Sequence, residues 1–102
     1  MPRTAKRLAP IHPGEVLFED FIAPRNLTAN RLAMDIHVPT NRISDLVRGR
    51  RSITAETALR LARYFDTTPE LWINLQSHYD LEIAKDAVGE AISREVIVAV
   101  GI

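Results

Sequence analysis

The chain has 102 residues, of which 46% are hydrophobic and 25% charged, as in one small globular domain, and its lack of cysteine excludes disulfides, thiolate metal sites and thiol nucleophiles. No apolar run approaches the length of a membrane span, and residues 1–10 lack the apolar stretch of a secretory signal, so we expect a cytoplasmic protein without membrane contact. The net charge of zero hides a basic segment, residues 25–63 with eight arginines and three acids, and an acidic one, residues 64–102 with two basic residues and seven acids.

The sequence predicts an all-α domain of five helices. The first helix begins at Pro13, which suits a first helical turn, and is expected to end before Pro24, because proline removes a backbone donor. Asn26 is then a left-handed turn residue, and Thr28 is the N-cap of the second helix. The second helix has apolar residues at helical spacing and ends at His37, which we also expect in the left-handed region.

The fourth and fifth helices have clear start signals. Thr54 is the predicted N-cap of the fourth helix, and the run Thr67-Thr68-Pro69-Glu70 combines a capping hydroxyl, a first-turn proline and an acid. After Lys85 the helical pattern weakens, and the β-branched run at residues 96–100 fits a strand, a packing tail or a frayed end. We therefore predict a flexible N-terminal arm over residues 1–12, a helical domain over residues 13–85 and a tail over residues 86–102.

The second and third helices are joined by about three residues, which is the spacing of a helix-turn-helix, whose second helix enters the major groove of DNA. The third helix would direct Ile43, Leu46 and Val47 inward and end at Gly49. The polar side chains left outside are the candidates for base reading: Thr40, Asn41, Arg42, Ser44 and Asp45. Asparagine can bond adenine, arginine guanine, and aspartate cytosine. The alternative is a solvated face on which Asp45 pairs with Arg48.

Six further residues around this motif are candidates for phosphate contacts, which position a protein on DNA without reading its sequence. They are Thr28, Asn30 and Arg31 at the start of the second helix, and Arg48, Arg50 and Arg51 after the third. Free N–H groups at a helix start attract anions. The alternative for Thr28 is simple capping, which does not exclude a phosphate contact.

No motif indicates catalysis, a metal site or a cofactor, since His12 and His78 have no nucleophile, ligand cluster or phosphate loop beside them. Trp72, Leu75 and Tyr79 share the apolar side of the fifth helix, where core packing or a dimer contact is more common than a ligand cage. We predict a homodimer with these three residues at its interface, because one short recognition helix reads too few base pairs for selective binding.

A series of short segments follows in order over residues 11–84. They are IHPGEVL (11–17), LA (32–33), NRI (41–43), GRRSIT (49–54), TALRL (57–61), WINLQ (72–76) and YDL (79–81). In this order they resemble the HigA-type antitoxins, which are lambda-repressor-like helix-turn-helix proteins. The resemblance implies binding to operator DNA as a dimer, repression of the protein's own operon, and neutralisation of a HigB-type toxin, an mRNA endonuclease. Many relatives have glycine where this chain has His37.

HigB-type toxins are usually basic, so the acidic half is the predicted toxin surface, with Glu70, Asp80, Glu82 and Asp86 as contacts. The N-terminal arm is the alternative location, and mere solvation of the fifth helix is the other interpretation of these acids. Two other functions stay open: a stand-alone transcriptional regulator without a toxin, and an interaction adaptor on this scaffold that does not bind DNA. Steep salt dependence of binding would exclude the adaptor.

Overall fold

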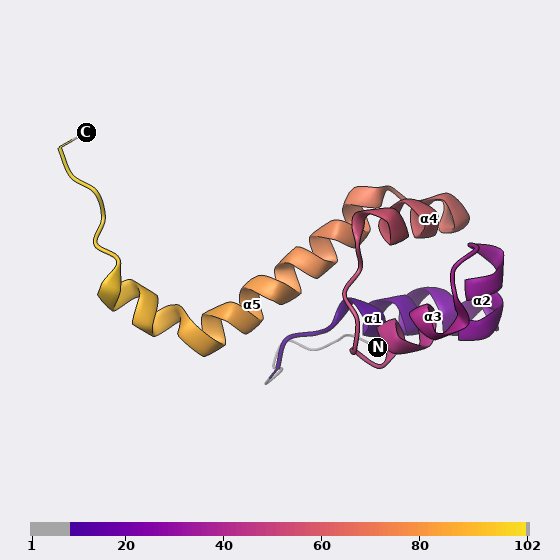
Figure 1. Cartoon of the computed structure of the whole chain (residues 1–102). Coiled ribbons are helices and arrows are strands. Elements are labelled where there is room, and N and C mark those ends of the chain that lie inside the picture. Colours follow the sequence, from indigo (N-terminus) through magenta and orange to yellow (C-terminus); the bar gives the residue numbers. More distant parts are fainter. Residues whose placement is uncertain (1–8, 102) are drawn as a thin grey trace.

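The computed structural model describes residues 9–101, so residues 1–8 of the predicted arm lie outside it. Its elements are α1 (Pro13–Val16), η1 (Leu17–Ile22), η2 (Ala23–Arg25), α2 (Ala29–Asp35), α3 (Thr40–Val47), α4 (Ala55–Phe65) and α5 (Pro69–Glu95) (Figure 1). The first three are continuous and together form the first predicted helix. The all-α, five-helix class is confirmed, and no strand occurs between residues 9 and 101.

The first helical segment passes Pro24, where it was expected to stop. Residues 17–22 form a π-helix, in which the N–H of Ala23 donates to the carbonyl of Phe18. Pro24 then lies in the first turn of the 3-10 helix η2, where its missing N–H is tolerated. The segment ends at Asn26, which takes the predicted left-handed conformation (φ 54°).

The predicted threonine caps are confirmed. The hydroxyls of Thr28, Thr54 and Thr68 accept hydrogen bonds from the backbone N–H three residues later, at 3.0, 3.3 and 3.2 Å. The first segment has a cap that was not predicted: the Nδ1 atom of His12 accepts from the N–H of Gly14 at 2.9 Å. The ordered body therefore includes His12, inside the predicted arm.

The first segment, α2, α3 and α4 end in the same way, with a residue at positive φ followed by an N–H that donates five residues back. At these four ends the residues at positive φ are Asn26, His37, Gly49 and Asp66. The bonds run from Leu27 to Ile22, Val38 to Ala33, Arg50 to Asp45 and Thr67 to Ala62. His37 has φ 62°, so its prediction as a left-handed turn residue is confirmed.

Trp72 is a core residue. It is fully buried, lies 4.8 Å from the ring of Phe21 and 6.3 Å from that of Phe65, and donates from Nε1 to Thr67 at 2.9 Å. The prediction that Trp72 contacts a second copy is wrong, because no part of it is accessible on the single chain. The rest of the core forms where helices pack together. The first segment packs against α3 and α5, α2 packs against α3, and α4 packs against α5.

α5 is longer than predicted. It continues past Lys85 to Glu95, so the tail was placed too early, and residues 96–101 follow it without regular structure. Its second half projects away from the body (Figure 1), and the radius of gyration is 16.7 Å, against about 13 Å for a compact chain of this length. The apolar pattern weakens where the helix leaves the core. Within residues 9–101, no helix is long and apolar enough to cross a membrane.

The first segment and α3 touch through their backbones at Gly14. A Cβ atom on Gly14 would lie 1.7 Å from the carbonyl oxygen of Leu46 and 3.0 Å from the Cα atom of Val47. Only glycine fits this contact, which joins the start of the first segment to the end of α3.

We predict that Gly14→Ala lowers the free energy of unfolding by about 3 kcal/mol, because the added methyl group forces two backbones apart. Urea unfolding would measure the change. Gly89→Ala in α5 is the matched control, since its Cβ would meet only the Cβ atom of Lys85 at 3.7 Å, and we expect it to be neutral or stabilising by up to about 1 kcal/mol. Equal midpoints for Gly14→Ala and the wild type would contradict the prediction.

Candidate nucleic-acid interface

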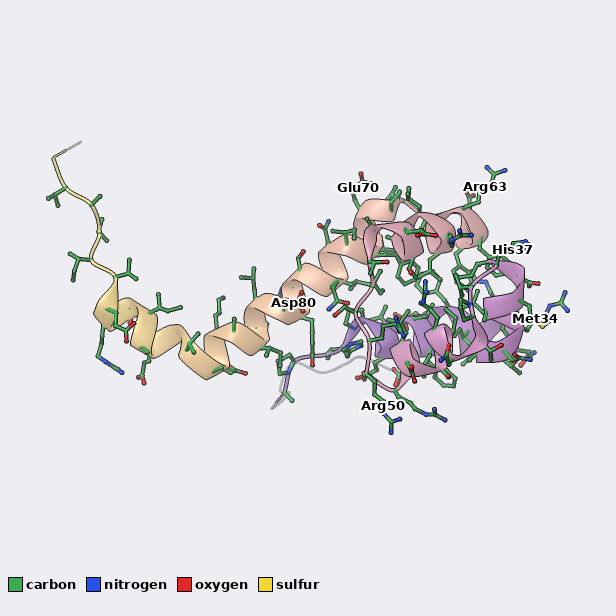
Figure 2. The ribbon with its side chains drawn as sticks, viewed as in Figure 1. Met34, His37, Arg50, Arg63, Glu70 and Asp80 are labelled. Carbon is green, nitrogen blue, oxygen red and sulfur yellow. The ribbon has the colours of Figure 1, made fainter. Side chains whose placement is uncertain are left out.

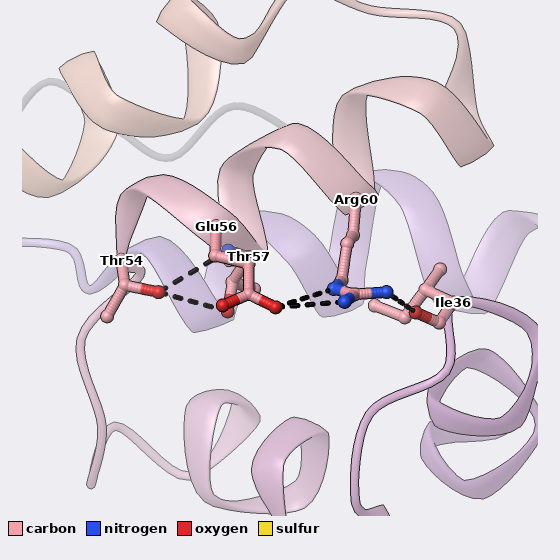
Figure 3. A network of polar contacts seen from close by, with 5 residues as sticks. All are labelled: Ile36, Thr54, Glu56, Thr57 and Arg60. Carbon is pink, nitrogen blue, oxygen red and sulfur yellow. Dashed lines mark hydrogen bonds and ion pairs between the residues drawn. The ribbon is translucent and has the colours of Figure 1, made fainter.

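α2 and α3 pack together as a helix-turn-helix, and α4 holds the turn between them (Figure 3). The Nη1 atom of Arg60 donates to the carbonyl of Ile36 at 3.0 Å, and its Nε and Nη2 atoms bond Glu56 at 3.2 and 2.9 Å. At the start of α4 the hydroxyl of Thr54 also bonds that of Thr57 at 3.2 Å. Arg60, one of the arginines of the basic segment, therefore stabilises the turn between α2 and α3.

Helical spacing divides α3 into a buried and an outward face. Ile43 and Leu46 are fully buried. The opposite face carries four polar residues, namely Asn41, Ser44, Asp45 and Arg48, with Thr40 and Arg42 at its flanks. Thr40, Asn41 and Arg48 are exposed, whereas Ser44 and Asp45 are half-buried. No ion pair between Asp45 and Arg48 occurs in the described structure, so these two side chains of the outward face are not tied to each other.

Arg42 is less exposed than a freely outward side chain. It is half-buried at the flank of α3, and its Nε atom is buried without a hydrogen-bond partner among the described residues. An unsatisfied buried donor costs free energy. One donor of this guanidinium is therefore left unpaired by the described residues.

The three candidates at the start of α2 have different surroundings. Thr28 caps the helix, as its alternative interpretation proposed, and Asn30 is exposed. Arg31 pairs with Asp35 at 3.1 Å, and Asp35 also accepts a 2.6 Å hydrogen bond from the hydroxyl of Tyr64. That bond, helped by the charge of Arg31, lowers the pKa of Asp35. Arg31 is thus oriented by an acid that stays ionised.

The arginine loop, residues 48–52, follows α3 and presents Arg48, Arg50 and Arg51 to solvent. Gly49 turns the chain at φ 77°. Arg50 projects from the edge of the body opposite Glu70, while Arg63 lies near the Glu70 side (Figure 2). Arg63, although part of the basic segment, therefore lies away from the arginine loop.

His12 contacts the arginine loop, a role that sequence reasoning missed. Its ring is half-buried and lies next to the backbone of Arg51 and 3.8 Å from the Cβ position of Gly49. It also meets the ring of Tyr79 edge-to-face at 4.8 Å. Its place directly before Pro13 was the available signal, because that is an N-cap position.

The charge state of His12 follows from its surroundings. Burial lowers its pKa below the usual value of about 6.5, while the charge of Asp80 and the nearby backbone of Arg51 act in the opposite direction. The neutral form also leaves Nδ1 free to cap the first segment. Because the folded pKa is depressed, His12 reduces stability as the pH falls from its unfolded pKa toward its folded pKa.

Gln76 also reaches this loop and was not predicted. Its buried amide accepts from the N–H of Ile53 through Oε1 at 2.7 Å and donates from Nε2 to Asp80 at 3.0 Å. A polar residue one helical turn after Trp72, on the same buried side of the fifth helix, was the available signal. α5 is thereby tied to the end of the arginine loop.

Comparison with known proteins places this geometry in a family. A family model described as Helix-turn-helix matches residues 20–72, which contain α2, α3 and α4. The chain belongs to the helix-turn-helix family. A curated relative, virulence-associated protein I of Dichelobacter nodosus, is 45% identical over 85 residues, 83% of this chain and 79% of that protein.

Two solved structures are similar to this chain over most of its length. The addiction module antidote protein of the HigA family from Coxiella burnetii has a TM-score of 0.86 and 48% identity, covering 90% of this chain and 100% of that one. The Pseudomonas aeruginosa antitoxin HigA, solved with the higBA promoter, has a TM-score of 0.87 and 41% identity, covering 89% and 99%. The predicted likeness to HigA-type antitoxins is confirmed.

The remaining candidates of this helix-turn-helix protein lie along α5. Leu75 and Tyr79 are half-buried against the body. Of the predicted toxin contacts, Glu70, Asp80 and Asp86 are exposed and Glu82 is half-buried. These acids are spread along the helix rather than gathered, and the described residues contain no group of three possible metal ligands.

Proposed function

We propose that this protein is an antitoxin that binds operator DNA as a homodimer, represses its own operon and neutralises a HigB-type toxin. The observation that carries the proposal is the outward polar face of α3 beside the arginine loop, on a helix-turn-helix similar to that of an antitoxin solved with promoter DNA. A major groove admits one helix, and phosphates on its edge would meet the loop.

The two parts of this surface have different tasks in the proposal. Asn41 at the exposed start of α3 reads a base. Arg50 and Arg51 bind the DNA backbone, because the guanidinium group of arginine can donate two hydrogen bonds to phosphate oxygens. Arg42 reorients toward the groove when DNA binds, since an acceptor there would satisfy the donor that is now unpaired. Arg48, which shares the outward face with Asn41, lies between the two groups.

A second copy of the chain covers the projecting part of α5 in this proposal. Leu81, Val88 and Ile92 share one helix face and are 60%, 46% and 49% exposed. Figure 1 shows the second half of α5 projecting away from the other helices, and an isolated helix gains little stability from its own hydrogen bonds. A two-fold dimer also doubles the DNA that is read. The interface thus lies further along α5 than Leu75 and Tyr79.

The toxin interface is proposed on the acids of α5, away from the arginine loop. Opposite charge would steer a basic toxin to Glu82 and Asp86 and leave α3 free for DNA. Lys85, which pairs with Glu82 at 3.7 Å, is the one cation near them on this stretch of the helix.

For DNA binding, we predict that Asn41→Ala weakens binding to the operator by about 1–3 kcal/mol and relaxes preference at one position, with the same result for Arg42→Ala. Arg50→Ala should weaken operator and random DNA alike and reduce the salt slope. Fluorescence anisotropy on DNA from upstream of the gene, over a range of salt, would measure both. Arg63→Ala is the control, and its affinity should equal that of the wild type. Wild-type binding by all variants would refute DNA recognition by α3, and weak salt dependence would favour the adaptor.

For the dimer, we predict that sedimentation at micromolar concentration gives two chains for the wild type. Val88→Asp or Ile92→Asp should give monomers, because a charge would be buried at the interface. Ser93→Asp, on a different face of the same helix, should stay dimeric. A monomeric wild type, with or without operator DNA, would disprove the proposal.

For the toxin, the chain should co-purify with the product of an adjacent toxin gene. The double variant Glu82→Lys and Asp86→Lys should slow association at low salt, and Lys85→Glu should accelerate it, because the changes in charge are opposite. Stopped-flow mixing would measure the rates. Unchanged rates in both variants would exclude the acidic face, and competition between operator DNA and toxin would place the toxin on the basic surface. The lack of any toxin gene would favour a stand-alone regulator.

A further inference from the structure

The arginine loop is held from two sides by side chains of other elements. On one side the ring of His12 lies next to the backbone of Arg51 and 3.8 Å from the Cβ position of Gly49. On the other, the amide of Gln76 accepts the N–H of Ile53, the residue that follows the loop. The N–H groups of Gly49 and Arg50 bond back to α3, but residues 51 and 52 have no regular structure, so the side-chain contacts help to determine where this part of the loop runs.

The amide of Gln76 has one orientation that satisfies both of its bonds. Its Nε2 atom donates to Oδ1 of Asp80, which leaves Oε1 facing Ile53. Both atoms belong to a buried side chain, where an unpaired amide would be costly. Asp80 therefore orients Gln76, and Gln76 orients the loop.

We propose that Gln76 is a positioning residue for DNA binding, through which α5 sets the backbone from which Arg50 and Arg51 reach the phosphates. Asp80 acts one step behind it by fixing the amide. This inference rests on the proposed DNA-binding function and adds residues that do not touch DNA. An apolar residue of similar size would fill the same space, so a purely packing role would not require an amide.

A double-mutant cycle tests the proposal in the full chain. With the wild-type loop, Gln76→Leu should weaken binding to both operator and random DNA by about tenfold, the loss of one charge-assisted contact. With Arg50→Ala and Arg51→Ala already present, the same change should weaken binding by less than about twofold, because the residues it positions are gone. Hydrogen exchange at the Ile53 N–H should become faster in Gln76→Leu.

Two controls separate positioning from loss of stability. Phe65→Leu, a core change at the end of α4 that is further from the loop, should lower stability without changing DNA affinity at a temperature where all variants are folded. Asp80→Asn keeps an acceptor for Gln76 and should bind DNA as the wild type does, whereas Asp80→Ala should weaken it.

The outcomes distinguish this inference from the function on which it rests. If Arg50→Ala with Arg51→Ala leaves DNA affinity unchanged, the phosphate role of the loop fails. If Arg50→Ala with Arg51→Ala weakens DNA binding, but Gln76→Leu lowers DNA affinity by the same factor with and without those substitutions, or leaves it unchanged in both cases, the positioning role of Gln76 is overturned.

Discussion

The contact between Gly14 and the carbonyl of Leu46 is the constraint on which the rest of this surface depends. It brings the start of the first helical segment against the end of α3, so His12 comes to lie over Gly49 and Arg51. Two backbones at this distance leave no room for adjustment, whereas packed side chains can change rotamer. The direction of α3, and with it the point at which the arginine loop begins, is thus fixed by the main chain.

Features governed by neighbouring residues could be predicted from the sequence. Threonine hydroxyls cap α2, α4 and α5 because each reaches an N–H only three residues away. Asn26 and His37 take left-handed conformations, which a small set of residues tolerates. The inward stripe of α3 follows from helical periodicity, and the outward face is its complement. The helix-turn-helix and its candidate base-reading residues therefore required no knowledge of distant contacts.

Features that depend on distant parts of the chain were missed or wrong. Arg60 and Gln76 form hydrogen bonds with residues 24 and 23 positions away in the sequence, and no local sequence pattern predicts such pairs. The π-helix before Pro24 widens one turn to let the proline pass, a change that hydrophobic spacing does not reveal. Trp72 was assigned to an interface because the depth of the core was unknown. α5 continues beyond its apolar pattern because that pattern marks only the part of the helix that packs against the body, and the helix extends past it.

α5 links surfaces that would otherwise be independent. Its first half carries Trp72 into the core and ties the arginine loop through Gln76, and its second half presents the apolar face of Leu81, Val88 and Ile92. One continuous helix transmits orientation well, because each turn is bonded to the next. A second copy on the distal face would therefore fix more than stoichiometry. It would set the distance between two α3 helices, and with them the two arginine loops, so the helix that joins the copies would also determine which spacing of half-sites on DNA the pair can span.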